Sequence, residues 1–239
     1  MFNTLLYQPI LATLTFLANL FQGNLGLAIL ALTLLLRTLL APLTIPSLRS
    51  AQKLRDLKPE IDRLKSKHKD KAALQKAQLE LYKKHGINPA AGCLPNILQL
   101  IILIALYQVF MNSLKGDSTS FNTSFLWLNL TTSDPLYILP ILAGLSQLVL
   151  SLMLSPAIEH HPEKTAKKTE DVQDMAETMQ QQMLFMMPIM TGIIALKFPS
   201  GLALYWVATT VFSVIQQYFV SGWGGLALSI KKALALVKR

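Results

Sequence analysis

Long runs of apolar residues alternate with shorter polar segments along this chain of 239 residues. The first well-defined run, residues 26–45, has about the twenty residues that a helix needs to cross a bilayer, and it contains a single arginine, Arg37. Four further apolar runs follow. The predicted spans, with their ends, are residues 24–47, 89–112, 134–155, 182–198 and 199–222. The pattern therefore predicts an all-α membrane protein with five transmembrane helices.

Residues 1–23 precede the first span and contain an apolar, uncharged stretch at 7–21, with Pro9 suited to a first helical turn. A basic leading region and a small-residue cleavage site, which would mark a signal peptide, are not found in it. We expect an N-terminal interfacial helix on the outer leaflet. A sixth span is the alternative, and it would reverse the side on which the N-terminus lies.

The basic residues gather on one side of the predicted spans. Of the 22 Lys and Arg, twelve lie within 49–84, three within 164–168 and four from Lys231 onward. The positive-inside rule assigns that side to the cytoplasm, which leaves the N-terminus outside and the C-terminus inside. The remaining segments are then an external loop at 113–133, a cytoplasmic loop at 156–181 and a basic cytoplasmic tail at 223–239.

The charged segment 48–88 carries two apolar stripes at helical spacing, within 54–64 and 74–81. Because both stripes stop between Lys67 and Lys71, the segment predicts a cytoplasmic hairpin of two helices. Its basic faces suit anionic lipid, ribosomal RNA or an acidic partner, whereas the alternative is a charged surface that only fixes topology. Aromatic residues do not interleave with the basic ones, so recognition of a specific nucleic-acid sequence is not expected.

Arg37 is the main functional candidate. A charged side chain near the middle of a spanning helix costs about 2.5 to 3.5 kcal/mol on insertion scales, so we expect its guanidinium to face protein or a water-filled cavity. No Asp or Glu lies inside another apolar run. Neutral side chains, backbone carbonyls, water or a substrate are therefore its expected partners. The alternative is an arginine that extends to the cytoplasmic surface.

A few other polar residues carry possible chemistry. Asn96 and Gln99 lie three residues apart on one face of the second span, where amides either join helices or line a hydrated cavity. Cys93 is the only cysteine, which excludes an internal disulfide. His160 and His161 sit in a short charged loop without further ligands, so no metal site is expected.

Three segments point to a known family. They are NPAAGCLPNILQLIILIALYQVF at 88–110, DPLYILPILAGLSQLVLSLMLSP at 134–156 and MQQQMLFMMPIMTGIIALKFPSGLALYWVATTVFSVIQQ at 179–217. In order and spacing they closely resemble the conserved core of the YidC family of membrane protein insertases. The resemblance implies a five-helix bundle around a hydrophilic groove that is open to the cytoplasm and to lipid and closed on the outer side.

The resemblance also implies roles for single residues. Arg37 matches the arginine at the centre of the groove, and Thr33, one helical turn earlier, matches a position that contacts substrate. Tyr205 and Trp206 match the aromatic pair of the fifth span, which with the third span forms the exit path of a client helix. From their polarity we add four amides to the expected groove wall: Asn96, Gln99, Gln147 and Gln216.

The expected function is that of a membrane protein insertase and chaperone rather than an enzyme. It would capture nascent hydrophobic segments and release them sideways into the plasma membrane of a bacterium, without nucleotide hydrolysis, cofactor or metal. Candidate partners are nascent membrane proteins, the ribosome, the signal recognition machinery, the Sec translocon and the lipid bilayer.

Two other functional classes fit the sequence less well. A small transporter or channel is one alternative, but such proteins often carry internal repeats and paired interrupted helices, and no such repeat is found here. An intramembrane hydrolase would need a catalytic Ser with Lys or His, paired Asp residues, or a metal motif within the spans, and none is found in this sequence.

Overall fold

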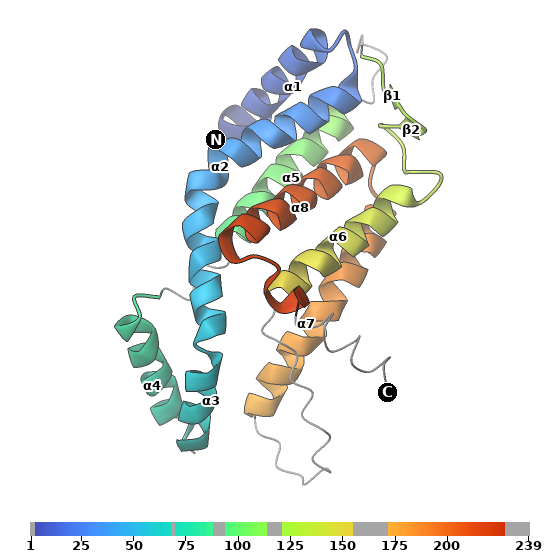
Figure 1. Ribbon diagram of the computed structural model, residues 1–239. Coiled ribbons are helices and arrows are strands. Elements are labelled where there is room, and N and C mark those ends of the chain that lie inside the picture. The colour runs from blue at the N-terminus through green and yellow to red at the C-terminus, as the bar shows by residue number, and fades with distance from the viewer. Residues whose placement is uncertain (1–2, 68–69, 88–93, 114–120, 155–171, 228–239) are drawn as a thin grey trace.

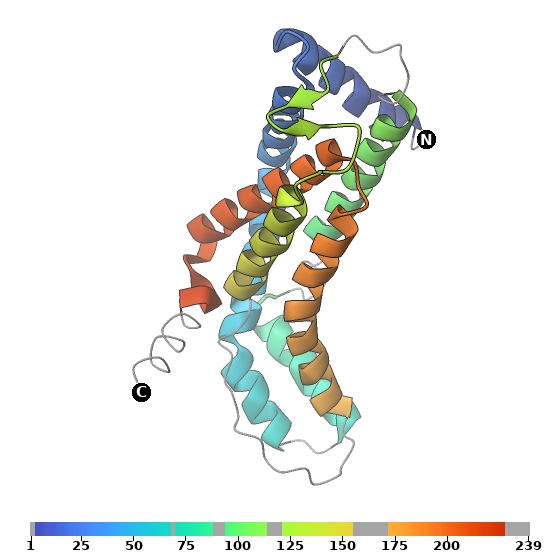
Figure 2. The ribbon, with the colours of Figure 1, turned by 90° about the vertical axis from the view of Figure 1, so that its right-hand side faces the viewer.

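The computed structural model describes residues 3–67, 70–87, 94–113, 121–154 and 172–227. This part of the chain is mostly helical, with one short β-hairpin. Its elements are η1 (Asn3–Tyr7), α1 (Gln8–Leu20), α2 (Leu25–Asp56), α3 (Lys58–Lys67), α4 (Lys71–Lys84), α5 (Leu94–Ser113), β1 (Ser124–Phe125), β2 (Leu128–Asn129), α6 (Ile138–Leu154), α7 (Val172–Ala195) and α8 (Ser200–Ser221). Helices α2 and α5 to α8 form an elongated bundle, with α1 and the β-hairpin at one end and α3 and α4 projecting at the other (Figures 1 and 2).

The predicted all-α class agrees with these helices. Among the described residues, α2 and α8 are each long and apolar enough to cross a membrane. The other bundle helices carry shorter apolar stretches, namely Ile97–Met111 in α5, Ile138–Leu154 in α6 and Leu184–Ala195 in α7. The described part of the structure thus contains membrane-span candidates at two of the five predicted positions and shorter apolar helices at the other three.

Helix α2 begins at a side-chain cap and continues beyond residue 47, where the predicted span ends. The side chain of Asn24 accepts a hydrogen bond from the backbone N–H of Leu27 at 3.0 Å, which satisfies one of the free donors of the first turn. Pro42 and Pro46 lie inside the helix. Proline removes a helical donor and displaces a carbonyl, and the ribbon of α2 changes direction along its length (Figure 1).

The two arms of the predicted hairpin are α3 and α4, and their break lies where the apolar stripes stop. Asp70 caps α4 by accepting a hydrogen bond from the N–H of Ala73 at 3.0 Å. At the other end, the N–H of Ile87 donates to the carbonyl of Tyr82, while Gly86 has a φ of +62°. Glycine adopts this left-handed conformation without a steric penalty, so Gly86 suits the end of the helix.

The largest buried cluster lies at the β-hairpin end of the bundle. It combines α1, the first half of α2, the second half of α5 and the first half of α8 with the loop after β2. Its fully buried members include Leu14, Leu25, Ile29, Leu32, Leu106, Phe110, Leu130 and Leu202. This end of the bundle is therefore closed by packed apolar side chains.

The segment around the β-hairpin joins the N-terminal ends of α2 and α8. The backbone of Asn122 donates to the carbonyl of Gly23 at 2.9 Å and accepts from the N–H of Leu25 at 3.3 Å. On the other side, the N–H of Gly201 donates to the carbonyl of Leu130 at 3.0 Å. These bonds satisfy backbone groups at helix ends and fix the relative position of α2 and α8, two of the three helices that form the site described below.

Helices α6 and α7 approach each other closely at two glycines. A side-chain carbon at Gly144 would lie 3.3 Å from the carbonyl oxygen of Pro188, and one at Gly192 would lie 3.4 Å from that of Pro140. Small residues allow such close contact between helix backbones, as is common between membrane helices. The face of α6 that carries Pro140 and Gly144 is therefore turned toward α7.

The contact between Gly201 and Phe110 gives a prediction about stability. A methyl group at position 201 would overlap the Phe110 ring, so Gly201→Ala should destabilise the protein by about 1 to 3 kcal/mol, the usual cost of overpacking a core. We expect a lower apparent unfolding temperature in detergent. Adding Phe110→Leu should recover part of the loss, and equal unfolding of Gly201→Ala and the wild type would contradict this packing.

Candidate functional site

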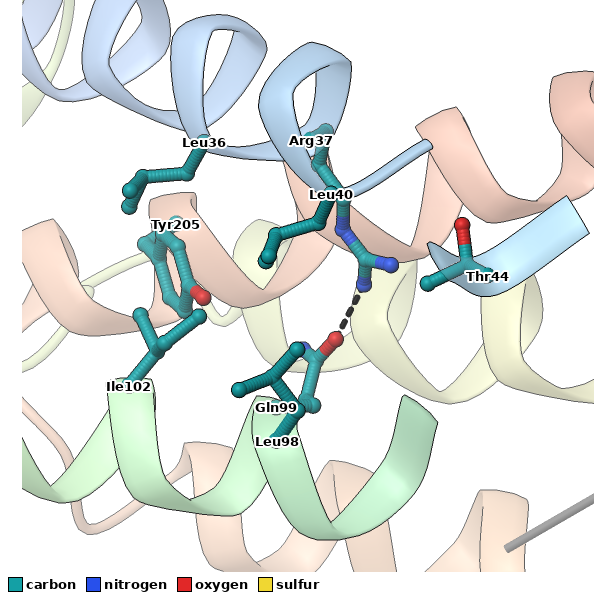
Figure 3. A pocket seen from close by; sticks show the side chains of 8 residues that line it. All are labelled: Leu36, Arg37, Leu40, Thr44, Leu98, Gln99, Ile102 and Tyr205. Carbon is teal, nitrogen blue, oxygen red and sulfur yellow. Dashed lines mark hydrogen bonds between the residues drawn. The ribbon is translucent and has the colours of Figure 1, made fainter. Parts of the chain in front are cut away.

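A pocket opens between α2, α5 and α8, on the side of the buried cluster that is away from the β-hairpin. The space in it that the centre of a water molecule can occupy is about 10 Å³, which is room for about one water. Its wall combines one charged residue with three other polar residues and four apolar ones (Figure 3). The lining residues are Leu36, Arg37, Leu40 and Thr44 from α2, Leu98, Gln99 and Ile102 from α5, and Tyr205 from α8.

Arg37 is held by two neutral side chains from two other helices. Its Nε donates to the hydroxyl oxygen of Thr209 on α8 at 2.9 Å, and its Nη2 donates to the amide oxygen of Gln99 on α5 (Figure 3). Within the described part of the chain, no Asp or Glu forms an ion pair with Arg37. The expectation of neutral partners is confirmed for these residues, and the positive charge stays uncompensated by protein carboxylates there.

A second hydrogen bond extends the polar contact between α2 and α8. The Nε2 of Gln216 donates to the hydroxyl oxygen of Thr44 at 3.0 Å. The pairs Arg37 with Thr209 and Thr44 with Gln216 have the same sequence separation, 172 residues. The two helices therefore run parallel in a constant register, and polar contacts recur after two helical turns.

Several predicted groove residues meet at this pocket. Arg37, Gln99 and Tyr205 line it, and Tyr205 is almost fully buried at 2% exposure. Gln216 lies outside the wall, but it donates a hydrogen bond to Thr44, which is a wall residue. Charge and polarity in the apolar runs indicated Arg37, Gln99 and Gln216, whereas Tyr205 was indicated by the family resemblance.

Other predicted residues lie elsewhere. Thr33 is buried, and its hydroxyl donates to the carbonyl of Ile29 in its own helix at 2.7 Å. The ring of Trp206 lies 6.0 Å from that of Phe198 and outside the pocket wall. Gln147 follows Gly144 by three residues, near the α7-facing side of α6, and is also outside the wall. Asn96 belongs to α5, but its side chain is outside the described part of the structure.

Two polar residues of the site were missed in the sequence. Thr209 lies four residues after Tyr205, one helical turn further along α8, and Thr44 lies seven residues after Arg37 on α2. Their spacing from residues already selected is the signal that was available. A threonine is common in apolar helices, however, so spacing alone does not distinguish these two from the others.

Some sequence expectations concern residues outside the described ranges. Cys93, His160, His161 and the basic tail from Lys231 onward belong to these. Within the described ranges, no group of three or more His, Cys, Asp or Glu side chains is arranged to hold a metal ion.

Comparison with known proteins assigns the family. Residues 16–224 match the family model described as 60Kd inner membrane protein. The membrane protein insertase YidC 2 of Bacillus anthracis is 36% identical over 226 residues, which cover 92% of this chain and 81% of that protein. The chain belongs to the YidC family of membrane protein insertases. The membrane protein insertase MisCA of Bacillus subtilis, strain 168, is 37% identical over 220 residues, covering 90% of this chain and 77% of MisCA.

A solved structure supports the same assignment for the fold. The crystal structure of an active YidC insertase with its first transmembrane domain resolved is similar to this chain with a TM-score of 0.65 and 25% identity. The match covers 91% of this chain and 46% of that longer chain. The family resemblance noted in the sequence is thus confirmed, and this chain spans under half of that YidC structure.

The site predicts how stability responds to loss of the charge. Arg37→Met keeps an unbranched side chain but removes a cation that has no carboxylate partner in the described residues, so we expect an apparent unfolding temperature equal to or above that of the wild type. Tyr205→Ala, which empties a buried position, should lower it. A clear decrease for Arg37→Met would mean that Arg37 mainly stabilises the fold.

Proposed function

We propose that this protein inserts apolar segments of nascent membrane proteins into the bacterial plasma membrane through the Arg37 pocket. The observation that carries the proposal is a cation between apolar helices whose hydrogen-bond partners, Thr209 and Gln99, are both neutral. A fixed positive charge inside the bilayer costs free energy. Such residues are therefore rare, and they usually mark substrate paths. Relatives in the YidC family are named membrane protein insertases.

In the proposed arrangement, α2, α5, α6, α7 and α8 each span the membrane. The end of the bundle with the β-hairpin faces outward, and α1 lies at the outer interface with its exposed Phe16 and Leu20 toward lipid. Helices α3 and α4 then lie in the cytoplasm. The positive-inside distribution of Lys and Arg supports this orientation, and the apolar stretches of all five helices support the span count.

The pocket acts on the polar tail of a client. The barrier to insertion is the transfer of a polar, often acidic, tail through hydrocarbon while the adjacent apolar helix enters lipid. A hydrated groove that reaches Arg37 from the cytoplasm shortens the dry part of that path. Because the local dielectric constant is lower than that of water, the guanidinium attracts a carboxylate more strongly there than at the protein surface.

Insertion is then driven by the membrane rather than by nucleotide hydrolysis. With the cytoplasm negative, each acidic charge gains about 2.3 kcal/mol per 100 mV on crossing outward. The apolar segment gains about 25 cal/mol for each Å² of its surface that leaves water, and it moves sideways into lipid. The packed cluster around Phe110 and Leu130 keeps the outer end closed, which limits leakage of ions and water.

The remaining expectations belong to the same proposal. Thr33, Asn96, Gln147 and Trp206 become groove residues if a client or a rearranged helix pair widens the pocket toward them. The basic surface of α3 and α4 docks the ribosome, the signal recognition machinery or anionic lipid, and the Sec translocon is a further candidate partner. No cofactor or metal has a role in this mechanism.

The role of the charge is tested by substitution at Arg37. We expect Arg37→Ala to reduce insertion of a client with an acidic outer tail about tenfold or more, while Arg37→Lys retains much of the activity because it keeps the positive charge. The measurement is protease protection of a single-spanning client in vesicles that carry a membrane potential. The matched control is the same client with its acidic tail residues changed to Asn or Gln.

This control client should depend less on Arg37, because it offers no carboxylate to the pocket. Equal insertion of the acidic client by the wild type, Arg37→Ala and Arg37→Lys would exclude attraction by charge as the mechanism.

A further inference from the structure

The two hydrogen bonds of Arg37 occupy one particular edge of its guanidinium. Nε and Nη2 lie on the same side of the planar group, which we call its side edge. These are the two nitrogens that donate to Thr209 and Gln99. The Nη1 nitrogen makes no hydrogen bond within the described residues. In Figure 3 the terminal nitrogen that is not bonded to Gln99 points away from that residue, toward the side of the pocket lined by Thr44.

We propose that Thr209 and Gln99 are positioning residues, which hold the side edge of the guanidinium so that its outer edge, Nη1 with the second hydrogen of Nη2, faces a client carboxylate. This inference rests on the proposed function and adds a geometry to it. A planar guanidinium binds a carboxylate through two parallel N–H to oxygen bonds, and either of its two long edges can serve. Because Thr209 and Gln99 occupy the side edge, the outer edge is the one left to bind a carboxylate.

Thr209 is well placed to fix the side chain. It is buried, with 1% of its surface exposed, and it lies one turn from Tyr205, whose side chain is 2% exposed. A free arginine side chain loses about 2 kcal/mol of rotamer entropy when it is ordered. Because α5 and α8 each supply one acceptor, much of that ordering is complete before a client arrives, which favours binding.

The two partners of Arg37 are neutral, and their neutrality preserves the charge of the site. A carboxylate at either position would hold the guanidinium equally well but would cancel the charge that attracts the client. A hydroxyl and an amide oxygen accept a hydrogen bond and leave the net charge of the site at +1. The chemistry selects Asp or Glu side chains, or a terminal carboxylate, as the group that the site receives.

The test compares Thr209→Val with Thr209→Ser. Valine keeps the shape of threonine but cannot accept a hydrogen bond, whereas serine keeps the hydroxyl. We expect Thr209→Val to slow insertion of a client with an Asp in its tail by about tenfold, as for loss of one hydrogen bond to a charged group, and to leave the matched Asn client unchanged. Thr209→Ser should retain the wild-type insertion rate for the Asp client. Gln99→Met should slow the Asp client as Thr209→Val does.

A second arm places Thr209→Val in the Arg37→Ala background. If Thr209 acts through Arg37, the substitution should have no further effect there. Equal slowing of the Asp and Asn clients, or further slowing in the Arg37→Ala background, would show a structural role and overturn the positioning inference. Failure of the proposed function is separate, because in that case Arg37→Ala itself would insert the Asp client at the wild-type rate.

Discussion

The hydrogen bonds from Arg37 to Thr209 and Gln99 are the interaction on which the account depends. A guanidinium among apolar helices needs acceptors, and in most buried sites a carboxylate supplies them and neutralises the charge. Here a hydroxyl and an amide oxygen satisfy two of its donors and leave the charge in place. The side chain is therefore stabilised without losing its attraction for anions, a balance that suits a site for transient capture better than a site for stability.

The rest of the bundle separates this charge from the outer side. Apolar packing around Phe110 and Leu130 fills the β-hairpin end, and backbone hydrogen bonds from the loop join α2 to α8 there. On the other side of Arg37, the contact between α2 and α8 continues through the hydrogen bond of Gln216 to Thr44. The two halves of the bundle thus differ in polarity, and the difference gives the proposed insertion path its direction from the cytoplasm to the lipid.

The sequence predicted the features that depend on local chemistry. Arg37 is conspicuous because a charge interrupts an apolar run, and the break between α3 and α4 lies where the two apolar stripes stop. What it did not predict depends on tertiary register. Thr209 reaches Arg37 only because α2 and α8 run parallel, in a register that pairs residues 172 positions apart in the sequence. Thr33 shares the face of Arg37, yet its hydroxyl is satisfied by the carbonyl of Ile29, an option that threonine always has in a helix.

The central claim is that the space around Arg37 is reached by water from the cytoplasm, and two neighbouring residues of α2 test it. Leu40 lines the pocket, whereas Leu39 is 70% exposed on the surface of the bundle outside the pocket wall. Each is replaced by cysteine in a Cys93→Ser background and treated with a charged, impermeant thiol reagent from the cytoplasmic side. If water reaches Arg37 from the cytoplasm, Leu40→Cys is labelled rapidly and Leu39→Cys slowly. The reverse order, or two unreactive cysteines, would contradict it.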